Sequence, residues 1–300
     1  MPLAFTVRPK KQIRVIIDTD ADCEADDPFA IAHALISPKL VVKAIFAEHF
    51  NIEGSTKRSY DEIKRILAAM ELSVPVFMGA EKPLSIDDEV ALSPASEYLI
   101  EEASKNDPMP LFVLCIGAIT NVAAAIKAHP EISLKMKIVW IAGHDYARAG
   151  KVPFKEYNSG NDIMAGNIIF GSDIELWQIP FNVYGSVRIG LAELQKRVYP
   201  CGKIGKHLFE KMVTYNGTDM ADWTAGESWS LGDSPAVGVA IDENCGKFEY
   251  REAPVFNEDT SYTFLGGRRK IRVYNSIDSR FVLEDFMSKL ELMYGTFAKQ

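Results

Sequence analysis

DTDADCEADD, residues Asp18–Asp27, follows the short apolar run Ile13–Ile17 and leads into a helical pattern at Asp26-Asp27-Pro28. The run is rich in β-branched residues, which favours a buried strand, and a first-turn proline is typical of a helix start. Six of these ten residues are acids, whereas 41 acids in 300 residues would place about 1.4 in such a window. A helix N-terminus supplies only about half a positive charge, so this strand exit needs a further positive partner.

Short apolar runs alternate with helical patterns along the chain, which predicts βαβ units and a mostly parallel sheet. The predicted strands are Ile13–Ile17, Leu40–Ala47, Val74–Met78, Leu111–Ile116, Ile138–Ala142 and Glu175–Ile179. Helices are predicted from Pro28 to about Ile36, then at Ser59–Met70 (with Ser59 and Glu62 as a capping box), Asn121–His129, Asn161–Phe170, Leu191–Arg197, Lys203–Tyr215, Pro235–Ile241 and Ser279–Tyr294.

Three late runs, Phe248–Arg251, Tyr262–Leu265 and Arg269–Tyr274, predict a small C-terminal antiparallel appendage. No linker long enough to mark a boundary is present, so we expect a single α/β domain over residues 1–300, a doubly wound sheet flanked by helices. In such sheets ligands bind at the carboxyl ends of the strands, which directs attention to each strand exit.

Composition excludes several classes of partner. The chain has 33 Lys and Arg against 41 Asp and Glu, a net charge of −8, which argues against nucleic acid and basic membrane-surface binding. Its longest apolar runs, such as Leu111–Ala118, fall far short of the roughly 20 residues of a membrane helix. Its four cysteines form no CxxC pair, which favours a reduced, cytoplasmic enzyme without a disulfide framework or zinc finger.

Carboxylates at this density suit a hard divalent cation, because Ca²⁺ takes six to eight oxygen ligands. An EF-hand is excluded, since its required Gly and Glu positions hold Cys23 and Phe29. A DxD phosphatase with Asp18 as nucleophile stays open, although Asp22 stands where that motif usually has Thr or Val. A capped helix with a solvated acidic loop is the alternative without chemistry.

The segment resembles the signature of the nucleoside hydrolase family, DxDPGxDD, in a longer variant with two more residues before the final DD pair. Asp20, Asp26 and Asp27 match the family's functional acids. Other segments resemble later family motifs in the same order: VPVFMGAEKPL (Val74–Leu84), LCIGAITNVAAAIKAHPEI (Leu114–Ile132), KEYN (Lys155–Asn158) and GDSP (Gly232–Pro235). The resemblance implies the nucleoside hydrolase fold and hydrolysis of an N-ribosidic bond.

The resemblance also implies roles for individual residues. The expected Ca²⁺ ligands are Asp20, Asp27, Asp233 and the backbone carbonyl of Ile116. Asp20 is also expected to accept a proton from the attacking water, and Asp26, the second catalytic carboxylate, to contact the ribose hydroxyls. Ribose contacts are further implied for Glu156, Asn158 and Asn51, with His49 as the alternative if the register differs. Glu156 and Asn158 are two apart, so on an extended segment both would face one side.

The late motif departs from the family pattern. Many members have a His before the metal-binding Asp, and this chain has Gly232. That His is the expected proton donor to the leaving base, so the role is open to Trp229, Glu227 or Trp223; a tryptophan would stack on the base. The departure also makes a non-catalytic ribose- or Ca²⁺-binding protein credible.

The sequence therefore predicts Ca²⁺-dependent hydrolysis of a ribonucleoside, or a related N-riboside, to ribose and free base. A homodimer or homotetramer is implied by the resemblance alone.

Overall fold

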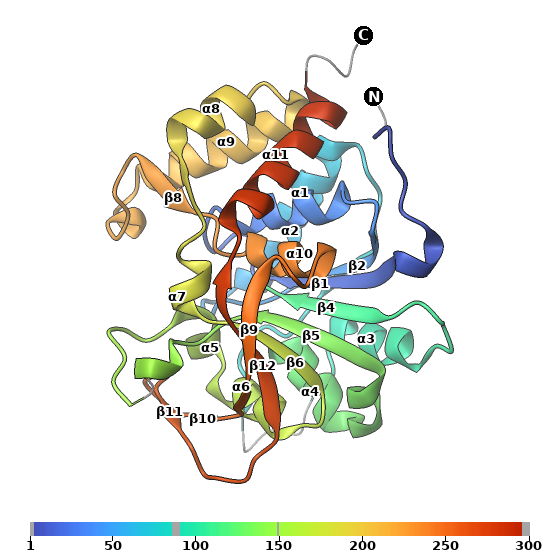
Figure 1. Cartoon of the computed structure of the whole chain (residues 1–300), viewed down its shortest axis with the longest axis vertical. Helices are drawn as coiled ribbons and strands as arrows, with labels where there is room; N and C mark the ends of the chain where they lie inside the picture. The colour runs from blue at the N-terminus through green and yellow to red at the C-terminus, as the bar shows by residue number, and fades with distance from the viewer. Residues whose placement is uncertain (1–2, 86–90, 149, 296–300) are drawn as a thin grey trace.

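The computed structural model in Figure 1 describes residues 3–85, 91–148 and 150–295 around one eight-stranded sheet. Its strands are β1 (Ile13–Thr19), β2 (Leu40–Ala47), β3 (Val76–Met78), β4 (Leu111–Cys115), β5 (Met136–Ile141), β6 (Glu175–Ile179), β9 (Gly246–Glu252) and β12 (Lys270–Ile277). The order is β3-β2-β1-β4-β5-β6-β12-β9, and every pair of neighbouring strands is parallel except β12 and β9, which are antiparallel. The predicted doubly wound, mostly parallel sheet is confirmed.

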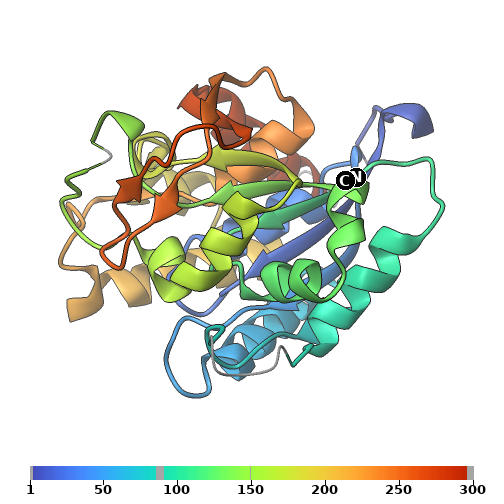
Figure 2. The ribbon, with the colours of Figure 1, turned by 90° about the horizontal axis from the view of Figure 1, so that it is seen from below.

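Helices cover both faces of the sheet and enclose two separate cores. One face carries α1 (Asp27–Leu35), α2 (Ser55–Met70), α8 (Leu191–Arg197), α9 (Gly202–Asn216), α10 (Ser234–Ile241) and α11 (Ser279–Tyr294). The other face carries α3 (Pro94–Ser104), α4 (Thr120–Ala128) and α6 (Ile163–Gly171), which Figure 2 shows from below. Strand β1 contributes side chains to both cores, because Val15 and Ile17 pack on one face of the sheet and Ile16 packs on the other.

The predicted antiparallel appendage is present but is not separate from the main sheet. Its strands β9 and β12 extend that sheet, with β12 parallel to β6 and β9 antiparallel to β12. Only β10 (Val255–Phe256) and β11 (Tyr262–Thr263) form a pair of their own. A further small pair joins β7 (Arg188–Gly190) to β8 (Ser228–Ser230).

Two helix starts differ from the sequence prediction. Helix α2 begins at Ser55, after Gly54 in the left-handed region at φ 73°, so the predicted capping box at Ser59 was wrong. Ser59 and Glu62 lie inside the helix, where both are buried. Helix α3 was missed, although Ser93 caps it by accepting the Ser96 N–H and a proline occupies its first turn.

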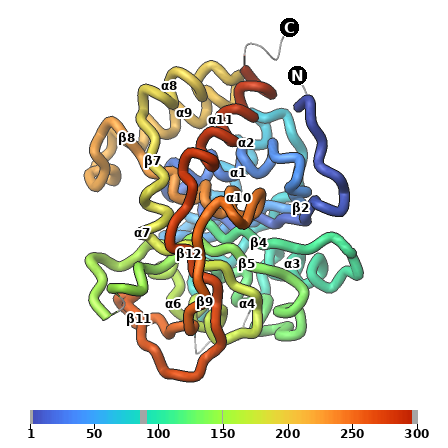
Figure 3. The backbone as a smooth tube through the Cα atoms, viewed as in Figure 1, coloured from blue at the N-terminus to red at the C-terminus, as the bar shows by residue number. Residues whose placement is uncertain are grey.

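The strand order places a topological switch point between β1 and β4. From β1 the chain proceeds to β2 and β3 on one side, whereas β5 and β6 follow β4 on the other. The tube in Figure 3 traces this reversal from the blue half of the sheet to the green half. Ligand sites in such sheets lie outside the carboxyl ends of the strands at this point, where Asp20 and Ile116 leave β1 and β4.

The expectation of a single domain over residues 1–300 stays a prediction, and residues 1–2, 86–90, 149 and 296–300 lie outside its described part. Within the described residues, every helix is too short or too polar to cross a lipid bilayer.

Candidate active site

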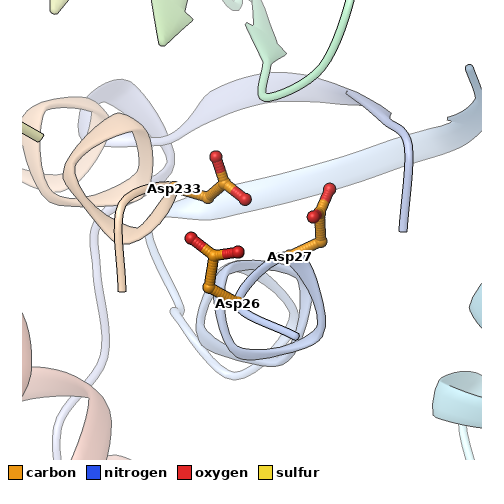
Figure 4. A group of neighbouring side chains, drawn as sticks. All are labelled: Asp26, Asp27 and Asp233. Atoms are coloured by element: carbon orange, nitrogen blue, oxygen red, sulfur yellow. The ribbon is translucent and has the colours of Figure 1, made fainter. Parts of the chain in front are cut away.

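The N-termini of α1 and α10 bring three acids together. Asp26 and Asp233 occupy the N-cap positions of these helices, and Asp27 is the first residue of α1. Neither N-cap side chain accepts a hydrogen bond from its own helix. Instead, oxygens of Asp26, Asp27 and Asp233 lie within 4.8 Å of one another, and the side chains point into one space (Figure 4). We call these three buried residues the aspartate trio. Helix capping alone does not account for the close approach of their carboxylates.

The electrostatics of the aspartate trio favour a bound cation. Burial, followed by the charges of neighbouring acids, raises the pKa of Asp26 and Asp233 well above the usual range. Burial also raises the pKa of Asp27 to about 6, although the Thr19 hydroxyl donates to its Oδ1 at 2.5 Å. Three buried carboxylates with oxygen ligands in reach of one another fit a hard divalent cation, so this cluster could hold a metal.

Asp20 lies beside the trio at the end of β1, with 2% of its surface exposed. Burial, then the charge of Asp27, raises its pKa well above the usual range. Its Oδ1 would lie 2.6 Å from a Cβ on Gly117, so only glycine fits at that point after β4. Asp20 therefore faces the β4 exit next to Ile116, and it lies outside the 4.8 Å group.

Asp18 is placed poorly for nucleophilic attack. It is fully buried, and its Oδ1 accepts a hydrogen bond from Asn121 Nδ2 at 2.9 Å. Burial raises its pKa to about 7, and the fully buried Glu48 lies close by. Because Asp18 is held by Asn121 and Glu48, the geometry argues against Asp18 as the nucleophile of a DxD phosphatase.

Glu156 and Asn158 lie near the end of β5, at the start of α5 (Tyr157–Asn161). Glu156 caps α5 and accepts hydrogen bonds from the N–H groups of Ser159 and Gly143 at 3.0 and 2.8 Å. Asn158 donates from Nδ2 to the Ile141 carbonyl at 2.9 Å. The extended geometry expected for this pair was wrong, because Asn158 belongs to the helix that Glu156 begins.

Asn51 and His49 follow β2 and differ sharply in exposure. Asn51 is exposed, adopts the left-handed region at φ 57° and borders a pocket of about 770 Å³. His49 is fully buried, accepts the Asn51 N–H at Nδ1 and donates from Nε2 to Thr120 at 2.8 Å. Burial lowers its pKa to about 4, so the ring is neutral and both its nitrogens are engaged. This favours Asn51 over His49 as the group free to meet a sugar.

The residues proposed for the leaving-group side do not reach the aspartate trio through any contact described in the structure. Trp229 on β8 is 1% exposed and packs edge-on against Tyr215 and Trp223. This burial favours a core role over stacking on a base. Trp223 and Glu227 are exposed.

Two residues of the site escaped the sequence analysis. Glu24 lies near Asp27 and Glu156, and burial raises its pKa to about 7; its only signal was membership of the acidic segment. Tyr184, at the end of α7 (Phe181–Tyr184), donates from its hydroxyl to Glu156 Oε1 at 2.9 Å. No motif marks Tyr184, because its place in the site arises from the tertiary fold.

The sequence model of the inosine-uridine preferring nucleoside hydrolase family matches residues 15–283. The chain belongs to this family. It is 29% identical over 204 residues to the pyrimidine-specific ribonucleoside hydrolase RihA of Salmonella typhimurium, a match that covers 61% of this chain. That match spans 64% of the length of RihA, somewhat less than two thirds. Membership confirms the resemblance drawn from the motifs.

Solved nucleoside hydrolases share the fold. The plant nucleoside hydrolase PpNRh1 superposes with a TM-score of 0.77 at 22% identity, covering 93% of this chain and 98% of its own. A purine-preferring ribonucleoside hydrolase from Gardnerella vaginalis gives a TM-score of 0.76 at 20% identity, covering 92% and 98%. The nucleoside hydrolase fold inferred from the sequence is confirmed.

Proposed function

We propose that this nucleoside hydrolase family member cleaves the N-glycosidic bond of a ribonucleoside, or a related N-riboside, with water, giving ribose and the free base. The observation that carries the proposal is the aspartate trio beside Asp20 at the β1–β4 switch point. Buried carboxylates that lie close to one another at a ligand-binding position of the fold are costly to keep, and chemistry at the site explains their presence.

We further propose Ca²⁺ as the cofactor, held by Asp20, Asp27, Asp233 and the Ile116 carbonyl. The aspartate trio, which contains two of these proposed ligands, supports a hard cation, because it offers carboxylate oxygens and neither cysteine nor histidine. A bound Ca²⁺ would supply a Lewis acid that orients water, lowers its pKa and ligates ribose hydroxyls.

The chain's own residues supply the remaining steps. Asp20 accepts a proton from the attacking water, whose oxygen forms a bond to the anomeric carbon while the bond to the base breaks. Asp26 and Glu156 accept hydrogen bonds from the ribose hydroxyls. The Glu156 carboxylate is held in place by hydrogen bonds from the N–H groups of Gly143 and Ser159 and from the hydroxyl of Tyr184. Asn158 and Asn51 add amide contacts to the sugar.

The identity of the base is open within this proposal. Relatives are named for pyrimidine and for purine substrates, so the substrate class is a ribonucleoside of either kind. Gly232 has no side chain that could donate a proton to the base. The candidates for contact with the leaving group are still the buried Trp229 and the exposed Glu227 and Trp223.

Release of reducing sugar from a panel of purine and pyrimidine ribonucleosides tests the function. We expect turnover that EDTA abolishes and added Ca²⁺ restores. A parallel assay with p-nitrophenyl phosphate tests the phosphatase: phosphate release without sugar release would contradict the proposal. Calorimetric ribose binding without any turnover would instead identify a non-catalytic sugar-binding protein.

We also propose a single domain, a cytoplasmic location and a homodimer or homotetramer. The domain proposal is supported by the single main sheet of the described residues, and the location by four cysteines that are free in the structure. The oligomer rests on family resemblance alone; light scattering on the eluting protein would measure it, and a monomer mass would contradict it.

A further inference from the structure

Gly232 lies where a side chain has no room, because the ring of Tyr184 fills the space. A Cβ placed on Gly232 would meet Tyr184 Cδ2 at 3.0 Å and Asp26 Oδ2 at 3.3 Å. Contacts of 3.0–3.4 Å are tighter than most Cβ contacts, so even alanine would press on both neighbours. The departure from the family pattern at Gly232 is therefore matched by a bulky residue that comes from α7.

The hydroxyl of the same tyrosine engages the carboxylate assigned to the sugar. Tyr184 donates to Glu156 Oε1 at 2.9 Å. The other oxygen, Oε2, already accepts from the Gly143 N–H, the Ser159 N–H and the Ser159 hydroxyl. Oε1 otherwise accepts only a long bond of 3.3 Å from the Asn158 N–H. Tyr184 thus makes the shorter hydrogen bond to Oε1, the oxygen of the buried Glu156 carboxylate that has the fewer donors and the greater remaining capacity to accept.

The ring of Tyr184 also begins an aromatic row that leads out of the site. Phe181 meets it edge-on at 5.3 Å between centroids, and Phe154 meets Phe181 at 4.9 Å. Phe181 and Phe154 are 39% and 43% exposed, whereas Tyr184 is only partly exposed. The row therefore extends from Gly232 and Asp26 towards solvent.

We propose that Tyr184 is a substrate-positioning residue of this site, whose ring replaces the side chain absent at Gly232 and whose hydroxyl holds Glu156 for the sugar. A phenol hydroxyl can accept one hydrogen bond while it donates another, so a sugar hydroxyl can bind Tyr184 without displacing it from Glu156. This inference rests on the proposed function for its substrate, and on the described contacts for its geometry.

The hydroxyl is tested by Tyr184→Phe, which keeps the ring. We expect KM for the best nucleoside, and the Kd for ribose measured by calorimetry, to rise about tenfold, the scale of one hydrogen bond to a charged group. We expect kcat to change less than KM, and the melting temperature to stay close to that of the wild type. The matched control is Tyr98→Phe on α3, whose hydroxyl makes only a 3.4 Å bond to the Lys43 carbonyl. Unchanged KM and ribose Kd in Tyr184→Phe would overturn the inference.

The ring is tested by coupling. Gly232→Ala alone should lower kcat/KM, whereas in a Tyr184→Ala background the same change should have a smaller effect, because the ring is gone and only the contact with Asp26 Oδ2 remains. Independent effects of the two substitutions would contradict the proposed replacement. If Tyr184→Ala does not fold, Tyr184→Leu serves as the background, since it also removes the ring edge.

The ribose titration separates this inference from the proposed function. A wild type that hydrolyses no nucleoside but binds ribose, more weakly in Tyr184→Phe, would reject the function and retain the role of Tyr184. Full nucleoside turnover in the wild type, with Tyr184→Phe indistinguishable from it, would reject the role of Tyr184 alone. A wild type with neither turnover nor ribose binding would reject both.

Discussion

Asp22 and the aspartate trio differ in the charges that surround their carboxylates: Asp22 lies among basic side chains, and the trio lies among other acids. Asp22 accepts from Arg58 Nε at 2.9 Å and Lys211 Nζ at 2.7 Å, with Arg65 at 3.9 Å. Asp26 and Asp27, four and five residues later, lie instead among other buried acids. Within one segment, Asp22 thus turns towards basic side chains, whereas Asp26 and Asp27 turn towards other acids. The difference indicates that basic side chains lie within reach of this segment but pair with Asp22, which leaves the aspartate trio able to accept the proposed cation.

The largest effect is expected on kcat, when Asp20 in the proposed site and the ion-paired Asp22 are each replaced by alanine. Asp20→Ala should lower kcat at least about a hundredfold, because it removes the proposed proton acceptor. Asp22→Ala should leave kcat within about a factor of three, since Asp22 is held in ion pairs away from the chemistry. Steady-state kinetics in saturating Ca²⁺ would measure both. Near-normal kcat in Asp20→Ala would remove its assigned role.

Ca²⁺ itself should stabilise the fold, because its proposed ligands, Asp20, Asp27 and Asp233, come together only in the folded chain. At a hundred times its Kd the stabilisation is about 2.7 kcal/mol, measurable as a rise in melting temperature by scanning calorimetry. Asp233→Asn should reduce that rise and Asp22→Asn should preserve it. An equal rise in all three proteins would place the cation elsewhere.

The stabilisation by Ca²⁺ should also depend on pH. The folded pKa values of Asp27 and Glu24 are about 6 and about 7, above the roughly 3.9 and 4.3 of unfolded chains. Between about pH 4 and 7 the folded, metal-free protein therefore holds more protons, so the contribution of these groups to stability falls as pH rises. Because Ca²⁺ replaces those protons, its effect on melting temperature should be larger at pH 7.5 than at pH 5. A larger effect at pH 5 would contradict the raised pKa values.

The smallest test compares stability without metal. In EDTA at pH 7.5, Asp233→Asn should raise the melting temperature, because it removes one charge from a set of repelling, desolvated acids. Asp22→Asn should lower the melting temperature, with a loss of at most about 1 kcal/mol in the free energy of unfolding, because partly exposed ion pairs are weak. The same Asp→Asn substitution is thus expected to raise the melting temperature at position 233 and to lower it at position 22. A lower melting temperature in both variants would contradict the proposed difference between Asp22 and the aspartate trio.

Much of the fold followed from the sequence because buried parallel strands carry continuous apolar runs. Leu40–Ala47 and Glu175–Ile179 have the predicted ends, as do Leu191–Arg197 and Ser279–Tyr294. The predicted start of α2 was wrong because Gly54 ends the preceding turn and the helix begins at Ser55, four residues before the expected cap at Ser59. Strand β12 was assigned to an appendage because a short apolar run does not reveal which edge it will join.

The candidate site was predictable only where a motif spans its residues. Asp20, Asp26 and Asp27 lie in one segment, and GDSP contains Asp233. Tyr184 lies 48 positions before Gly232, and its contact with that residue depends on how α7 and α10 pack around the sheet. A glycine in a sequence shows that a side chain is missing; it does not show which distant ring fills the space.

The order of the strands also sets when the site can first exist. Asp27 and Asp233 are separated by 206 positions in the chain, and ribosomes add about 5 to 20 residues per second. For roughly 10 to 40 seconds the growing polypeptide carries Asp20, Asp26 and Asp27 without their last partner. The outer edge of strand β6 likewise stays unpaired until β12, some 90 residues later in the chain, has been synthesised. With the proposed ligand set, the complete cation site can form only after Asp233 has been synthesised.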